Sequence, residues 1–192
     1  MNDISDEDLM LRIQRADDPE AFAELFRRYR ARITSYTCRL LGDADEGENL
    51  AQETFLRLLE KGGLYSYPRR FSTWLFTIAR NLVTDFQKKK RAVTTASFDL
   101  VADGQKDAEH RRPDVATAEQ EAMESLLAAV DGLPLPYREV LILRAFYEMS
   151  YREIAEIVDC PESTARSRMD YALKELRKHC RRFGDPKISD IS

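Results

Sequence analysis

The sequence predicts an all-α protein of two small helical domains joined by a flexible linker. Apolar residues recur every three or four positions over most of the 192 residues, and no segment shows the strict alternation of a strand. Only the segment 92–116 lacks this periodicity. We therefore expect a first domain over 1–91, a linker over 92–117, a second domain over 118–183 and a C-terminal tail over 184–192.

The first strong helical pattern covers residues 18–42. Asp18 is a suitable N-cap, and Pro19 suits the first helical position. One apolar stripe follows at helical spacing, and its members are Phe22, Leu25, Phe26, Tyr29, Ile33, Tyr36 and Leu40.

A second helix is expected over 43–63. Acidic residues at its start suit the helix dipole, and Gly62 and Gly63 favour its end. Its apolar residues are Leu50, Phe55, Leu58 and Leu59. The segment 64–70, LYSYPRR, is an aromatic and basic loop.

The segment 71–91 predicts a helix that is aromatic at its start and basic at its end. Its expected core face is Leu75, Ile78, Leu82 and Phe86. Aromatic rings can stack on unpaired bases, and cations neutralise phosphates. Such a helix is unusual in a chain with formal net charge −4, and we interpret it as a surface for opened DNA. The residues leave open whether Trp74 stacks on bases or belongs to the core.

The segment from Ala92 to Glu124 carries eight acids against three bases, with a Gly and a Pro. This composition indicates a solvated linker.

The second domain contains the pattern of a helix-turn-helix. Ser150 can cap a short helix whose Ile154, Ala155 and Val158 face inward, and DCPES forms the turn. Ser163 or Thr164 is expected to cap the next helix, with Met169, Leu173 and Leu176 in the core.

That last helix is basic inside an acidic protein. Seven Lys or Arg and three acids lie between Glu162 and Arg182. A solvated amphipathic helix would explain any single arginine. It would not explain the helix, turn, capped helix and local charge reversal together, so we predict DNA binding here.

Four stretches together resemble the extracytoplasmic-function (ECF) class of the sigma-70 family of sigma factors. They are DPEAFAELFRRYR, ENLAQETFLRLLEK, FSTWLFTIARNLVTDFQKKKR and YREIAEIVDCPESTARSRMDYALKELR. The resemblance implies a sigma-two domain followed by a sigma-four domain, in a protein that is not an enzyme. It also implies binding to core RNA polymerase, recognition and melting of promoter DNA, as duplex and single strand, and control by an anti-sigma factor.

The resemblance assigns roles to three groups of residues. The polymerase-binding positions are Glu48, Asn49, Leu50, Gln52, Glu53 and Leu56. The downstream promoter element is assigned to Tyr65, Ser66, Tyr67, Arg69, Phe71, Trp74, Arg80, Asn81, Lys88, Lys89, Lys90 and Arg91. The upstream element is assigned to Ser163, Thr164, Arg166, Ser167, Arg168, Tyr171 and Lys174.

The chain departs from the family pattern in each group. Asn49 stands where Asp is usual, and Asp170 departs from the common choice in the recognition helix. Tyr67, Pro68 and Arg69 replace the small and acidic residues usual in the loop, so we expect an altered base preference.

Two other classes of function explain the sequence less well. A stand-alone helix-turn-helix regulator would leave the aromatic and basic helix unexplained. An enzyme lacks support, because the two histidines, His110 and His179, belong to no catalytic motif. The spacing of Cys160, His179 and Cys180 is not that of a zinc site, so we expect no metal and no cofactor. The acidic start and the absence of a long apolar run favour a cytoplasmic protein without membrane insertion.

Overall fold

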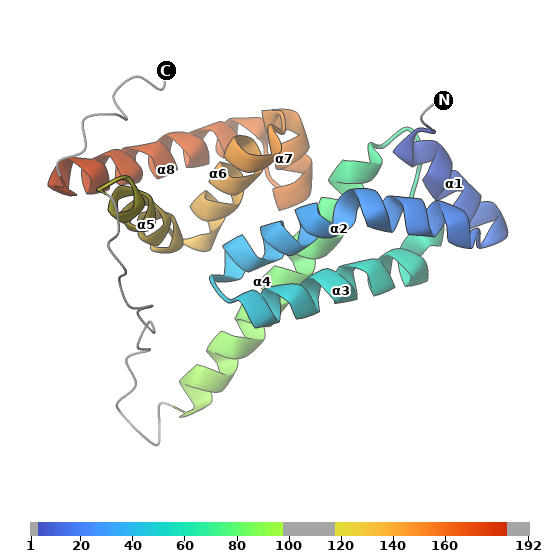
Figure 1. The fold of residues 1–192 in the computed structure, drawn as a ribbon, viewed down its shortest axis with the longest axis horizontal. Coiled ribbons are helices and arrows are strands. Elements are labelled where there is room, and N and C mark those ends of the chain that lie inside the picture. The colour runs from blue at the N-terminus through green and yellow to red at the C-terminus, as the bar shows by residue number, and fades with distance from the viewer. Residues whose placement is uncertain (1–3, 98–117, 184–192) are drawn as a thin grey trace.

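The structure is a computed structural model that describes residues 4–97 and 118–183. Every regular element in these ranges is a helix, which confirms the expected all-α class (Figure 1). The first domain contains α1 (Asp6–Ala16), α2 (Pro19–Leu41), α3 (Ala44–Lys61), a 3-10 turn (Gly62–Leu64) and α4 (Phe71–Ser97). The second domain contains α5 (Ala118–Asp131), α6 (Leu135–Tyr147), α7 (Tyr151–Val158) and α8 (Glu162–Phe183).

Helix α2 begins where the sequence predicts. The Asp18 carboxylate accepts hydrogen bonds from the backbone N–H groups of Glu20 and Ala21, at 3.0 and 3.1 Å, and Pro19 opens the helix. The expected stripe is buried from Leu25 to Leu40, whereas Phe22 and Phe26 are half-buried. Local capping and periodicity therefore suffice to place this helix.

Helix α1 was not expected from the sequence. Ser5 caps it by accepting from the backbone N–H of Asp8, and acids fill its first turn. Leu9, Met10 and Ile13 are buried against the rest of the first domain. The cap, the acids and the apolar spacing are all present in the sequence, so this signal was available.

Helix α3 lies antiparallel to α2 at very close range. A Cβ atom added at Gly47 would lie 2.5 to 2.7 Å from atoms of Cys38, which is closer than real contacts allow. The Thr37 hydroxyl donates to the Gly47 carbonyl oxygen at 2.7 Å. Glycine is therefore required for this helix crossing.

The buried face of α4 differs from the expected one. Leu75 is fully buried as expected, but Ile78, Leu82 and Phe86 are only half-buried. Phe71, Phe76, Ala79 and Val83 are fully buried instead. The reason is that α4 is packed on two sides, by α2 and α3 of its own domain and by α7 of the second domain. Helix α4 also continues to Ser97, and the remainder of the expected linker, 98–117, lies outside the described residues.

The second domain has the expected helix-turn-helix. Ser150 and Glu153 form a capping box at the start of α7, and Ile154, Ala155 and Val158 are buried as predicted. The predicted cap of α8 at Ser163 or Thr164 is wrong, because the helix begins at Glu162. The Pro161 carbonyl oxygen accepts from the N–H groups of Thr164 and Ala165, so Pro161 stands at the cap position.

The two domains pack against each other in the structure. Helix α7 lies against α4, and α6 lies against α2 (Figure 1). This arrangement decides which candidate DNA-binding residues are open to solvent.

Candidate nucleic-acid interface

The candidate polymerase-binding residues lie along one side of α3. Glu48, Asn49, Gln52 and Leu56 are exposed, and Leu56 retains 55% of its surface. Leu50 and Glu53 are half-buried, and Glu53 accepts from the Arg57 guanidinium at 2.8 Å. An exposed leucine beside polar side chains is typical of a surface that binds another protein.

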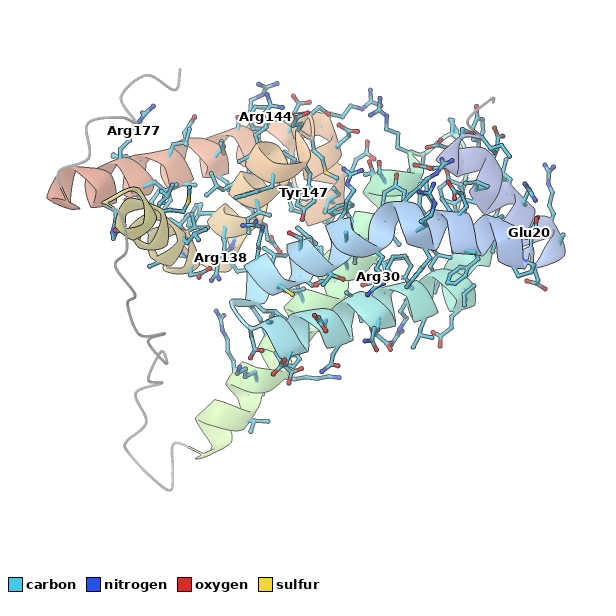
Figure 2. The ribbon with its side chains drawn as sticks, viewed as in Figure 1. Glu20, Arg30, Arg138, Arg144, Tyr147 and Arg177 are labelled. Carbon is cyan, nitrogen blue, oxygen red and sulfur yellow. The ribbon has the colours of Figure 1, made fainter. Side chains whose placement is uncertain are left out.

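A groove of about 620 Å³ lies between α2 and α3 beside these residues. Glu48 and Gln52 line its α3 side, and Arg27 and Arg30 line its α2 side. Figure 2 labels Arg30 between α2 and α3. The family resemblance assigned polymerase binding to residues of α3 alone. The groove adds arginines of α2, which sequence reasoning missed because it assigned α2 only a core stripe.

The loop between α3 and α4 is held by α1. The Gln14 side-chain amide donates to the carbonyl oxygens of Gly62 and Tyr65, at 2.7 and 2.8 Å. The Glu7 carboxylate accepts from the backbone N–H of Phe71 at 3.0 Å and so supports the start of α4. Sequence reasoning missed both residues because it did not recognise α1.

Three aromatic residues assigned to the downstream element lie in the core. Tyr65, Phe71 and Trp74 retain 4%, 0% and 7% of their surface. The Tyr65 and Trp74 rings meet edge to face at 5.4 Å, and burial raises the pKa of Tyr65 to about 12. An open stacking surface at Tyr65 and Phe71 is therefore not found, and Trp74, for which both uses were left open, lies in the core, because the rings of the loop and of α4 pack on one another.

The exposed part of this loop is different. Ser66 and Tyr67 face solvent, and Tyr67 retains 64% of its surface. Tyr67 is thus the aromatic ring of the loop that is open to a base. Asn81, which lies about three turns from the start of α4, is also exposed.

Two arginines of the loop and one of α4 make ion pairs with the second domain. Arg70 Nη1 lies 2.7 Å from Glu153 Oε1, and Arg69 Nε lies 3.9 Å from Glu156 Oε2. Arg80 Nε lies 3.2 Å from Glu139 Oε1. Arg69 and Arg80 were assigned to promoter DNA. In this arrangement both form ion pairs with carboxylates of the second domain. The four cations from Lys88 to Arg91 are exposed at the far end of α4.

Glu139 of α6 is the most buried charged residue among those described, with 1% of its surface exposed. Burial raises its pKa, while Arg80 and then Arg168 act in the opposite direction. The Nη1 atom of Arg168 is buried without a hydrogen-bond partner among the described residues. Tyr36 of α2 also interacts with Glu139. Burial raises the pKa of the Tyr36 hydroxyl well above its ordinary value, and the charge of Glu139 raises it further.

The recognition helix α8 presents most of its assigned residues to solvent. Ser163, Arg166, Ser167, Tyr171 and Lys174 are exposed, and Thr164 is half-buried. The Arg166 guanidinium lies 4.6 Å from the Tyr151 ring centroid and pairs with Glu162. Tyr171 stacks on Tyr137 with 4.1 Å between ring centroids.

Arg168 is the exception on this helix. It is half-buried and lies close enough to Glu139 to affect its pKa, so it differs from its neighbour Arg166 in what it faces. The structure therefore groups Arg166 with the exposed face and Arg168 with the domain boundary.

The described ranges contain neither a membrane-spanning helix nor a cluster of metal-binding side chains. No helix within 4–97 or 118–183 is both long enough and apolar enough to span a bilayer. The same ranges hold no group of three His, Cys, Asp or Glu residues placed to bind a metal ion, and the Cys180 side chain lies outside the description.

Comparison with protein families gives two matches. Residues 25–93 match the model of sigma-70 region 2, and residues 123–176 match the model of sigma-70 region 4. These ranges correspond to the two helical domains.

The chain is similar to curated proteins over most of its length. It is 32% identical to the ECF RNA polymerase sigma factor SigW of Bacillus subtilis, over 85% of this chain and 91% of that protein. It is 33% identical to the ECF RNA polymerase sigma factor RpoE of Cereibacter sphaeroides, over 89% of this chain and 92% of that protein.

Solved structures share the fold. The Bartonella quintana sigma factor RpoE in complex with the anti-sigma factor NepR matches with a TM-score of 0.68 and 22% identity, over 83% of this chain and 96% of that one. CnrH in complex with the cytosolic domain of CnrY matches with a TM-score of 0.66 and 19% identity, over 90% and 95%. With the two domain matches and the relatives above, the chain belongs to the ECF class of the sigma-70 family of RNA polymerase sigma factors, which are transcription initiation factors and not enzymes.

Proposed function

We propose that this sigma factor binds core RNA polymerase through α3 and the α2–α3 groove, and promoter DNA through α8 and the α3–α4 loop. The observation that carries the proposal is the exposed face of α8, where Arg166, Ser167 and Lys174 lie on a helix-turn-helix. Recognition helices place such residues in the major groove, and arginine is well matched to guanine.

The downstream element is assigned to the open side of the loop. Tyr67 offers an exposed ring, and Asn81 an exposed amide. A base that leaves the stack can be held by an aromatic face and by hydrogen bonds to its edge. The exposed cations from Lys88 to Arg91 would neutralise backbone phosphates.

The polymerase surface is supported by exposure and by chemistry. Leu56 and Gln52 are exposed on α3, and the neighbouring groove has arginines on one wall and Glu48 on the other. A mixed apolar and charged surface of this kind suits a specific protein partner. An anti-sigma factor is a further partner, supported by the related folds that were solved in complex with NepR and CnrY.

Run-off transcription with purified core polymerase and a library of promoter fragments tests the proposal. We expect transcription from a subset of the library that shares an upstream and a downstream element. A Gln52→Arg/Leu56→Arg variant should lose co-purification with core polymerase while its helical content and Tm stay near those of the wild type. Transcription by that variant at the wild-type level would place the docking surface elsewhere.

A further inference from the structure

One face of α1 carries three side chains that lie against the segment 62–71, which joins α3 to α4. They are Glu7, Met10 and Gln14, which follow one another at spacings of three and four and so form a single stripe along the helix. We call these residues the α1 stripe. Glu7 Oε1 accepts from the backbone N–H of Phe71 at 3.0 Å, where α4 begins. A Cβ atom added at Gly62 would lie 3.0 Å from the Met10 Cε atom, so the segment runs close to the stripe at both of its ends.

The Gln14 amide fixes the first half of this segment. Its Nε2 atom donates to the carbonyl oxygens of Gly62 and Tyr65, at 2.7 and 2.8 Å. A side-chain amide nitrogen carries two hydrogens, so each carbonyl oxygen can receive its own. One side chain of α1 therefore sets the separation of two backbone groups of the loop.

The second half of the segment is closed by groups of the loop itself. The Arg69 N–H donates to the Ser66 carbonyl oxygen at 3.1 Å, and the Tyr65 hydroxyl donates to the Arg69 carbonyl oxygen. The Tyr65 ring is buried and packs edge to face on Trp74. The backbone is therefore held on both sides of Tyr67, whose side chain faces solvent.

A loop that is held in this way has its binding shape before a base arrives. Ordering a flexible backbone at the moment of binding costs free energy for each residue, and a loop that is already ordered avoids this cost. A fixed ring also discriminates better between bases, because a base of another shape cannot draw the loop into a new position. The Tyr67 ring and the Asn81 amide offer the contacts, and the α1 stripe sets the position from which Tyr67 makes them.

We propose that Gln14 is a positioning residue that determines base specificity at the downstream element through the loop, without contacting DNA. Its side chain is half-buried, and its amide hydrogens are used by the loop. Loss of these two hydrogen bonds loosens the loop. The favoured base then loses the most, because it alone makes the full set of contacts, and discrimination between bases falls. This inference rests on the proposed function, because it concerns the base-reading site assigned there to Tyr67 and Asn81.

The test uses the full-length protein with core polymerase and three variants. Gln14→Met keeps the length of the side chain and removes its donors. Gln14→Lys keeps donors and places a cation in the last turn of α1, where the helix dipole favours it. Ile13→Val shortens a buried side chain of the same helix outside the α1 stripe, so it controls for lost stability alone. Run-off transcription from promoters that carry each base in turn at the downstream element measures discrimination.

Trp74 provides a second measurement that does not depend on transcription. It is the single tryptophan of the chain, and its ring centroid lies 5.4 Å from that of Tyr65. Acrylamide quenching of its fluorescence therefore reports how tightly the loop packs on α4.

We expect Gln14→Met to lower the ratio of transcription between the favoured base and the others by about tenfold, the order expected when one or two backbone residues must be ordered on binding. Quenching of Trp74 should rise in the same variant, and Gln14→Lys should match the wild type in both measurements. Ile13→Val should lower Tm and keep the wild-type base preference. The proposal is overturned if Gln14→Met keeps the wild-type preference or the wild-type quenching, or if Ile13→Val loses as much discrimination.

Failure of this inference is distinct from failure of the proposed function. A wild-type protein that transcribes equally from every promoter of the set removes the base-reading role of the loop, and the inference with it. A wild type with a clear preference that Gln14→Met shares removes the role of Gln14 alone.

Discussion

Helices α4 and α8 both carry residues assigned to promoter DNA, yet they present them in opposite ways. On α8 the Arg166 side chain is 58% exposed and its partners lie on its own domain. On α4 the Arg80 side chain is 21% exposed and its partner lies on the other domain. The residues assigned to promoter DNA are therefore not equally accessible in the structure: the Arg166 side chain is open to solvent, whereas the second domain contacts the Arg80 side chain.

The two helices also differ in what their aromatic residues do. The core of the first domain contains Phe71, Trp74 and Phe76 of α4. By contrast, Tyr171 of α8 stacks on Tyr137 at the surface of the second domain. A helix can therefore carry aromatic residues for the core and cations for DNA at the same time, and only packing distinguishes the two uses.

The largest expected effect is that of Trp74→Ala, which tests whether α4 uses this ring for its core. Removing a buried indole should lower the free energy of unfolding by about 3–5 kcal/mol, measured by urea denaturation. Tyr67→Ala, at an exposed ring of the same loop region, should change it by less than about 0.5 kcal/mol. A stable Trp74→Ala protein with a melting defect that a premelted promoter rescues would restore the stacking role and remove this contrast.

Arg80→Ala should have the next largest effect, because it leaves the buried Glu139 carboxylate without its cation. Breaking a buried pair from one side costs about 3 kcal/mol or more, read from the urea midpoint. The double variant Arg80→Ala/Glu139→Gln should recover part of this loss, since no unpaired charge remains. If the double variant is no more stable than Arg80→Ala alone, the ion pair is not what holds these helices together.

Arg166→Ala and Arg168→Ala should separate the two sides of α8. Arg166→Ala should weaken binding to the cognate upstream element by about 1–3 kcal/mol without a change in Tm. Arg168→Ala should instead lower Tm, because Arg168 lies beside Glu139. Equal losses of DNA affinity and no change in Tm for both variants would place Arg168 on the DNA face after all.

The smallest effect concerns pH and Glu153. Burial acts to raise the pKa of Glu153, but hydrogen bonds from Ser150 and the ion pair with Arg70 outweigh it, so its pKa lies below the ordinary value. A carboxyl with a lowered pKa contributes stability above its unfolded pKa of about 4.3, and the contribution is lost as pH falls through the folded value. The difference in unfolding free energy between wild type and Glu153→Gln should be below about 1 kcal/mol at pH 7 and should shrink below pH 4.3. A difference that grows in acid would contradict the assignment.

The accuracy of the sequence predictions followed the range of the interactions involved. The caps at Asp18 and Ser150 were predictable because both ends of each hydrogen bond lie within three residues. The burial of the α2 stripe was predictable because period 3.6 fixes one face.

The errors came from contacts across long separations. The core face of α4 was misplaced because α7 covers a second side, and nothing local to α4 indicates this. Arg80 and Glu139 are 59 positions apart, so no spacing rule connects them. The rings of Tyr65 and Phe71 were assigned to DNA, and Trp74 was left open, because composition alone does not separate a stacking aromatic from a packed one. Helix α1 was missed although Ser5 and the following acids formed a readable start signal.

The Gln14 amide has a consequence for how promoter preference can change during evolution. It holds the loop by two carbonyl oxygens, those of Gly62 and Tyr65, and every residue has a carbonyl oxygen. The path of the loop is thus tied to a side chain in another helix and only weakly to the identity of the loop's own exposed residues. Ser66 and Tyr67 can be exchanged for other side chains while these two hydrogen bonds stay, so the positions proposed to face a base can change by single substitutions without rebuilding the domain that displays them.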